Sequence, residues 1–106
     1  MADLSDTSPQ LTVHADESGP EPVISVAGEL DLATAPQLTA AAKASLDSNP
    51  QRVVFDLSEL RFMDSSGLRV LLEIANQAEV SIRAASDAVR RIIDSTGVQE
   101  ILKIEA

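Results

Sequence analysis

The stretch Phe62–Leu68, "FMDSSGL", marks a change in hydrophobic periodicity. Before it, "VVFDL" (Val53–Leu57) begins with three consecutive apolar residues, as does a central strand that is covered on both faces. After it, apolar residues recur at helical spacing, at Leu68, Leu71, Leu72 and Ala75. The pattern therefore predicts a strand over Arg52–Leu60 and a helix that begins near the paired serines, Ser65 and Ser66.

Patterns outside this stretch alternate strands with helices. Further strands are predicted at Leu11–Asp16, Val23–Leu30, Glu79–Ser86 and Gln99–Ala106. One further helix is predicted from near Thr34, because Thr34 and Gln37 fit a capping box. Another follows Ser86, which can cap it, and Gly97 suits a left-handed cap at its end.

This alternation predicts the fold class. Strands and helices in turn favour a mainly parallel sheet with crossover helices, and the first strand would pair at one side of it. We therefore predict a single α/β domain over residues 10–106, with a mixed sheet of about five strands and with about three helices. Residues 1–9 are polar and predict a flexible N-terminal tail.

Composition limits the classes of partner. The net charge is −9 over 106 residues, so DNA, RNA and anionic membrane surfaces would be repelled. A partner surface rich in Arg and Lys is the electrostatic complement. The chain contains no cysteine, which excludes disulfides and thiolate metal sites. It lacks a signal-peptide pattern and a long apolar run, so we predict a cytoplasmic protein without membrane insertion.

Two adjacent serines at the start of a helix allow three interpretations. Serine is a good N-cap, because its hydroxyl accepts a hydrogen bond from a backbone N–H of the first turn. Asp64 would favour the positive end of the helix dipole, and Gly67 would let the helix pack close to a strand. The second interpretation is a nucleophile, and the third is a serine that accepts phosphate.

Catalysis by this chain is not predicted. An acyl-transfer serine needs a base, and the only histidine, His14, falls in a predicted edge strand. The elbow pattern Gly-x-Ser-x-Gly, a Walker-type loop and a metal-spaced cluster of His and Asp are absent from the sequence. We therefore expect a protein that is not an enzyme and that has neither a cofactor nor a metal site. A serine hydrolase remains a remote alternative.

Three blocks of the sequence favour the phosphoacceptor. "FMDSSGL", together with "GELD" (Gly28–Asp31) and "VRRIIDSTGV" (Val89–Val98), resembles the STAS domain family and specifically its anti-sigma factor antagonists. The resemblance runs from about Leu11 to Glu105, with the strands and helices in the same order. It implies the STAS fold and a protein that is a substrate and binding partner rather than a catalyst.

In members of that family, the first serine after the aspartate is phosphorylated by an anti-sigma factor, itself a serine kinase of the histidine-kinase-like ATPase fold. The resemblance therefore implies Ser65 as the phosphoacceptor, with Ser66 as the less favoured choice. Unmodified protein would bind the kinase and release its sigma factor, phosphorylation would end that binding, and a metal-dependent serine phosphatase would reset the switch. The residues expected to bind the partner are Glu29, Asp31, Asp64, Ser65, Ser66, Gly67 and Arg69.

Two alternatives stay open at this point. The same resemblance also fits a non-enzymatic scaffold or subunit of a lipid-transport or stress-signalling complex, although a free acceptor hydroxyl in "DSSG" favours the kinase substrate. Arg69, four residues after Ser65, could neutralise a phosphate there or could stay solvated.

Overall fold

The computed structural model describes residues 10–98 and 100–105. In chain order the elements are β1 (Leu11–Asp16), β2 (Val23–Leu30), α1 (Ala35–Leu46), β3 (Arg52–Met63), α2 (Ser65–Ala75), β4 (Glu79–Arg83), α3 (Asp87–Ser95) and β5 (Leu102–Ile104). The predicted tail at residues 1–9, and Gln99 and Ala106 of the predicted last strand, lie outside the described residues. The predicted order of strands and helices is confirmed.

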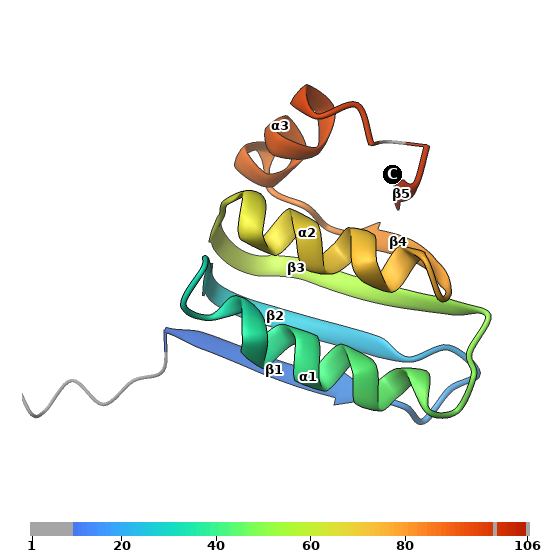
Figure 1. Cartoon of the computed structure of the whole chain (residues 1–106). Helices are drawn as coiled ribbons and strands as arrows, with labels where there is room; N and C mark the ends of the chain where they lie inside the picture. Colours follow the sequence, from blue (N-terminus) through green and yellow to red (C-terminus); the bar gives the residue numbers. More distant parts are fainter. Residues whose placement is uncertain (1–9, 99, 106) are drawn as a thin grey trace, which may run out of the picture.

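The sheet has the strand order β1-β2-β3-β4-β5. β1 runs antiparallel to β2 and the later pairs are parallel, which confirms the predicted mixed, mainly parallel sheet. α1 and α2 lie side by side over one face, α1 against β1 and β2, and α2 against β3 and β4 (Figure 1). The crossovers step in one direction across the sheet, and right-handed crossovers of that kind place their helices on the same face.

That face carries the core. Ile24, Phe55 and Ile82 are neighbours in register and are fully buried. The cluster of buried side chains joins them to residues of α1, α2 and α3. With few aromatic residues in the chain, aliphatic side chains fill most of this interior.

The opposite face of the sheet is more exposed. Ser25, Asp56 and Arg83 form the next row in register and are partly or fully exposed, because alternate residues of a strand point to opposite faces. The run Val53–Phe55 is buried as predicted. Beyond that run the same face is more open: Asp56 is half-buried, since the crossover helices gather on the other side of the sheet.

Three strands differ in length from their predictions. β3 extends to Met63, because its last residues pair with the end of β2. β4 ends at Arg83 rather than at Ser86, since Ala84 adopts a left-handed φ of 59° that interrupts an extended strand. β5 is limited to Leu102–Ile104.

Both ends of α3 agree with the prediction. The Ser86 hydroxyl accepts a hydrogen bond from the Val89 backbone N–H at 3.3 Å, so Ser86 is the N-cap. Gly97 follows the helix with a left-handed φ of 72°. These signals act within one helical turn, which is why the sequence predicts them well.

Candidate functional site

The first turn of α2 is capped by Asp64 and by neither serine. The Asp64 carboxylate accepts a hydrogen bond from the Ser66 backbone N–H at 2.8 Å. The Asp64 carbonyl oxygen accepts from the N–H groups of Gly67 and Leu68, at 3.1 and 3.3 Å. The prediction that a serine caps this helix is therefore wrong: the aspartate lies one residue earlier and is a charged acceptor for the same donors.

The two serine hydroxyls are consequently not used by the helix cap. Ser65 is exposed and Ser66 is half-buried. Within the described part of the chain, neither hydroxyl forms a hydrogen bond. The Ser65 oxygen thus lies at the start of α2, open to solvent.

Gly67 determines how closely α2 approaches the sheet, as predicted. It is buried, and a Cβ built on it would lie 2.6 Å from Leu30 Cγ and 2.8 Å from Met63 Cγ. Leu30 ends β2 and Met63 ends β3, so the first turn of α2 lies directly on the ends of two central strands. A hydrogen bond of 3.1 Å from the Asp64 N–H to the Leu30 carbonyl joins the same elements. The serines are therefore held on a rigid base.

The turn between β2 and α1 is built around Asp31 and Thr34. The Asp31 carboxylate accepts hydrogen bonds from the N–H groups of Ala33 and Thr34, at 3.0 and 3.1 Å. The Thr34 hydroxyl accepts from the Asp31 N–H and donates to the Glu29 carbonyl, both at 2.9 Å. Such bonds from short polar side chains to the nearby backbone stabilise turns. Asp31 thus has a structural role in addition to any contact with a partner.

The capping box predicted from Thr34 and Gln37 is wrong. The Thr34 hydroxyl faces back into the turn, and no side chain caps α1. The Gln37 side-chain amide donates instead to the Leu11 carbonyl of β1, at 3.0 Å, so a tertiary contact replaces the local one. The same turn leaves Leu32 at its tip with 77% of its surface exposed.

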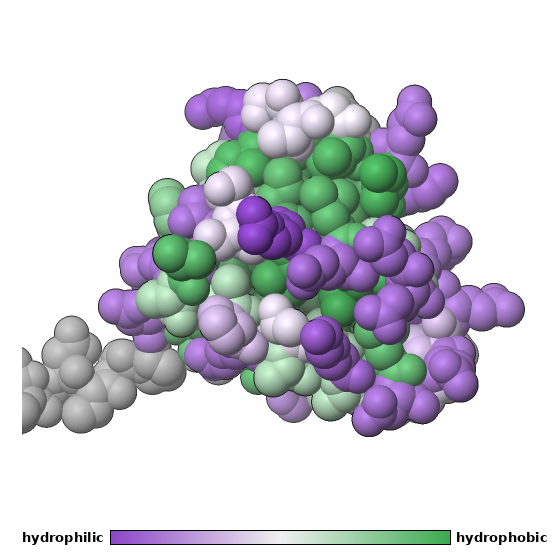
Figure 2. Space-filling view, in the orientation of Figure 1, coloured by the Kyte–Doolittle hydropathy of each residue, from purple (hydrophilic) through white to green (hydrophobic). Residues whose placement is uncertain are grey.

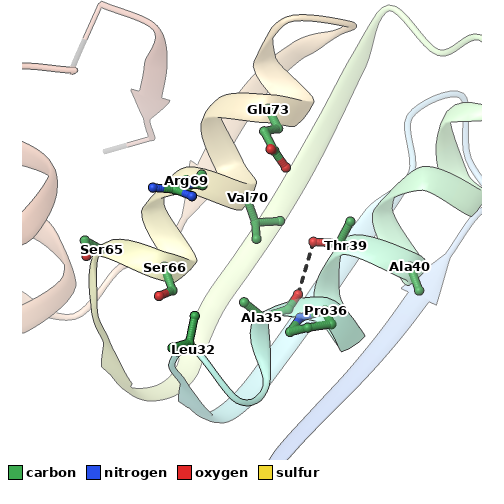
Figure 3. A pocket seen from close by; sticks show the side chains of 10 residues that line it. All are labelled: Leu32, Ala35, Pro36, Thr39, Ala40, Ser65, Ser66, Arg69, Val70 and Glu73. Carbon is green, nitrogen blue, oxygen red and sulfur yellow. Dashed lines mark hydrogen bonds between the residues drawn. The ribbon is translucent and has the colours of Figure 1, made fainter.

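A groove of about 550 Å³, here called the α1–α2 groove, runs between the two helices. Ser65 and Ser66 line it from the start of α2 (Figure 3). Hydrophobic patches lie between hydrophilic side chains on this face of the molecule (Figure 2). The apolar side chains that line the groove are Leu32, Ala35, Pro36, Ala40 and Val70.

Two charged side chains of α2 also line the groove. The Glu73 carboxylate points toward α1, and the Arg69 guanidinium points toward the end of α2 that carries Ser65 (Figure 3). Arg69 is in none of the ion pairs found among the described residues, whereas Arg61 pairs with Glu29 at 3.4 Å. The groove therefore combines apolar walls, two hydroxyls and one charge of each sign.

The structure brings some of the predicted site residues together and gives others separate contacts. Those that line the α1–α2 groove are Ser65, Ser66 and Arg69. Those with structural contacts described above are Glu29, Asp31, Asp64 and Gly67. The sequence prediction missed Leu32, Val70 and Glu73; helical spacing from Ser66 is a signal that could have found the last two. Leu32 has no such local signal.

His14 lies away from the serines. It is exposed on β1, in register with Ser25, and it is not among the residues that line the groove. Among residues 10–98 and 100–105, no group of three or more His, Cys, Asp or Glu could hold a metal ion. No helix of that part of the chain is long and apolar enough to cross a membrane.

Comparison with known proteins gives matches over most of the chain. A family model described as "Mlab, STAS domain" matches residues 13–103. The chain is similar to the anti-sigma-F factor antagonist RsfB of Mycobacterium tuberculosis, with 30% identity over 98 residues, covering 89% of this chain and 80% of the relative. It is also similar to the anti-sigma-B factor antagonist of Listeria monocytogenes, with 32% identity over 87 residues, covering 77% of this chain and 76% of the relative. A solved anti-sigma factor antagonist from Mycobacterium paratuberculosis matches with a TM-score of 0.82 and 30% identity, covering 92% of this chain and 87% of that chain.

Proposed function

The chain belongs to the STAS domain family, and from that premise we propose that it is an anti-sigma factor antagonist that binds its partner at the α1–α2 groove. The names of similar proteins support this class. The observation that carries the proposal is the Ser65 hydroxyl, which is exposed, free of hydrogen bonds within the described residues, and set beside apolar groove walls. A partner that covers the groove would reach this oxygen.

The proposed partner is an anti-sigma factor that is a serine kinase of the histidine-kinase-like ATPase fold. Unmodified protein binds it, and the kinase releases its sigma factor. The Ser65 oxygen then attacks the γ-phosphorus of the ATP held by the kinase: an O–P bond forms, the bond to the bridging oxygen breaks, and ADP leaves. The hydroxyl proton passes to a base of the kinase. A metal-dependent serine phosphatase transfers the phosphate to water and restores Ser65.

A phosphate on Ser65 weakens this complex through its charge and its size. It adds about −1.5 to −2 charges at pH 7, beside the carboxylate of Asp64. Because the partner would cover the apolar groove, the anion would have to lose water on binding. A hundredfold loss of affinity requires only about 2.7 kcal/mol, and one uncompensated charge in an interface can cost that much.

Incubation with the cognate anti-sigma factor and ATP, followed by peptide mass spectrometry, tests the acceptor. We expect one phosphate, on Ser65. Ser65→Ala should abolish it, and Ser66→Ala, the matched control, should retain it. Phosphate found only at other residues would refute the assignment of Ser65.

Binding separates the switch from the scaffold alternative. Ser65→Ala should bind the anti-sigma factor as tightly as the wild type does, because the hydroxyl has no partner to lose. Ser65→Asp should bind more weakly, because it places an anion at the groove. Equal affinity of the two variants in titration calorimetry would favour a passive scaffold or subunit.

A further inference from the structure

Three backbone N–H groups in the first turn of the helix that would carry the phosphate are already bonded. Free backbone N–H groups at a helix N-terminus can hold an anion. In α2, the N–H of Ser66 is bonded to the Asp64 carboxylate, and those of Gly67 and Leu68 to the Asp64 carbonyl. A phosphate on Ser65 would also lie next to the negative charge of Asp64. Its charge therefore calls for a cation from elsewhere.

Arg69 is the cation in the right place. It is exposed, and among the residues that line the α1–α2 groove it alone is positively charged. It has no ion pair within the described residues. Arg61, near the end of β3, is instead paired with Glu29 at 3.4 Å. Arg69 can therefore take a new partner without breaking an ion pair seen in this part of the chain.

Helix geometry puts Arg69 within reach of Ser65. The two residues are four positions apart on α2, so their Cβ atoms lie roughly 5–6 Å apart on one side of the helix. An anion four residues before a cation is the favourable orientation. In Figure 3 the guanidinium already points toward the end of the helix that carries Ser65. A guanidinium can donate two parallel hydrogen bonds to phosphate oxygens.

We propose that Arg69 is the intramolecular counter-ion of a phosphate on Ser65. This inference rests on the proposed function, in which Ser65 is the acceptor. One modification then changes the α1–α2 groove in two ways. It adds a bulky anion at the start of α2, and it engages the arginine that would otherwise be available to a carboxylate of the partner. Arg69 acts here as a positioning residue and takes no part in phosphoryl transfer.

The test uses the full chain with phosphoserine genetically encoded at position 65, so it depends on no kinase. Phosphorus NMR measured over a range of pH gives the second pKa of the phosphate. A paired guanidinium favours the dianion and lowers this pKa. Arg69→Gln should therefore raise it by about 0.2–0.4 unit, the size expected for one such helix pair. Arg69→Lys should restore most of the effect.

Control variants separate the effect of Arg69 on the phosphate pKa from the effects of other charged residues. The other charged side chains of α2, of the end of β3 and of the β2–α1 connection include Glu29, Asp31, Arg61, Asp64 and Glu73, and they are unchanged in every variant. So are Asp87, Arg90, Arg91 and Asp94 of α3, which packs against β3. Lys43→Gln, at an exposed lysine in the last turn of α1 and thus at the other end of the helix pair from Ser65, should leave the phosphate pKa unchanged (Figure 1). Thermal melting monitored by circular dichroism checks that each variant is folded.

The inference and the proposed function fail in different ways. A phosphate pKa that is the same with Arg69 and with Arg69→Gln, or that shifts equally in Lys43→Gln, overturns the assignment of Arg69 as the counter-ion. The proposed function is instead refuted if the cognate anti-sigma factor binds the phosphoserine protein and the unmodified protein equally well.

Discussion

Gly67→Ala asks whether the close approach of α2 to the sheet supports the site. The added Cβ would lie 2.6 Å from Leu30 Cγ and Cδ2, and 2.8 Å from Met63 Cγ. Carbon atoms in favourable contact are about 3.5–4.0 Å apart. Leu30 and Met63 are 0% and 2% exposed, so neither side chain can turn into solvent. Either these side chains leave their rotamers or α2 moves away from the sheet.

Two opposing effects determine how much Gly67→Ala changes the free energy of unfolding. Alanine is favoured over glycine inside a helix by up to about 1 kcal/mol. Overpacking of a filled core costs about 1–3 kcal/mol, and three contacts below 3 Å place this site in the upper part of that range. We expect a net loss of about 1–2 kcal/mol in the free energy of unfolding, which corresponds to a Tm lower by roughly 5–12 °C for a domain of this size.

Urea denaturation measures this loss as a lower midpoint with an unchanged slope. Gly19→Ala is the matched control, because a Cβ there meets nothing within 4 Å; its stability should stay within about 0.5 kcal/mol of the wild type. If Gly67→Ala were as stable as the wild type, the close contact with Leu30 and Met63 would not be what requires glycine.

Three further substitutions test the cap, the turn and the groove. Asp64→Ala should lower the free energy of unfolding by about 1 kcal/mol through loss of the cap, while Asp64→Asn should retain most of it; equal stability of the two in urea would exclude a capping role. Thr34→Val removes a buried hydroxyl that bridges two backbone groups of its turn, so it should cost about 1–3 kcal/mol. Thr34→Ser should cost much less, and a Tm for Thr34→Val that matches the wild type would contradict the role of the hydroxyl. Leu32→Ala should leave the Tm nearly unchanged, because Leu32 is 77% exposed, yet weaken binding to the anti-sigma factor by about fivefold or more in titration calorimetry. Ile101→Ala, at another exposed apolar side chain, is its control; undiminished affinity of Leu32→Ala would place the docking surface away from the α1–α2 groove.

At the start of α2, the sequence predicts the helix but does not determine which residue caps it. Asp64, Ser65 and Ser66 are all good N-cap residues, so the sequence offers three adjacent candidates of similar quality. The path of the chain as it leaves β3 selects Asp64, whose backbone N–H is bonded to the Leu30 carbonyl at the end of β2. That bond joins residues far apart in sequence, and no local rule contains it.

A similar competition decided the start of α1. Thr34 and Gln37 have the spacing of a capping box, but the Thr34 hydroxyl bonds within the preceding turn and the Gln37 amide reaches Leu11 of β1. At the start of α3 the local prediction holds, because the Ser86 hydroxyl is the side-chain acceptor of the Val89 N–H and no residue of another element replaces it. Local capping rules therefore hold where no tertiary contact offers the same groups another partner.

The sequence by itself determined three features of this protein: the fold class, the order of its elements and the position of Ser65 at the start of a helix. These follow from hydrophobic periodicity and turn chemistry, which depend on neighbouring residues. The tertiary structure alone decided that Leu32, Val70 and Glu73 share one groove with that serine. The physical reason is that the sheet sets α1 beside α2, while Gly67 allows α2 to rest on the ends of β2 and β3. Side chains from separate elements come together only through that packing, and the packing places an exposed serine beside a groove with apolar walls.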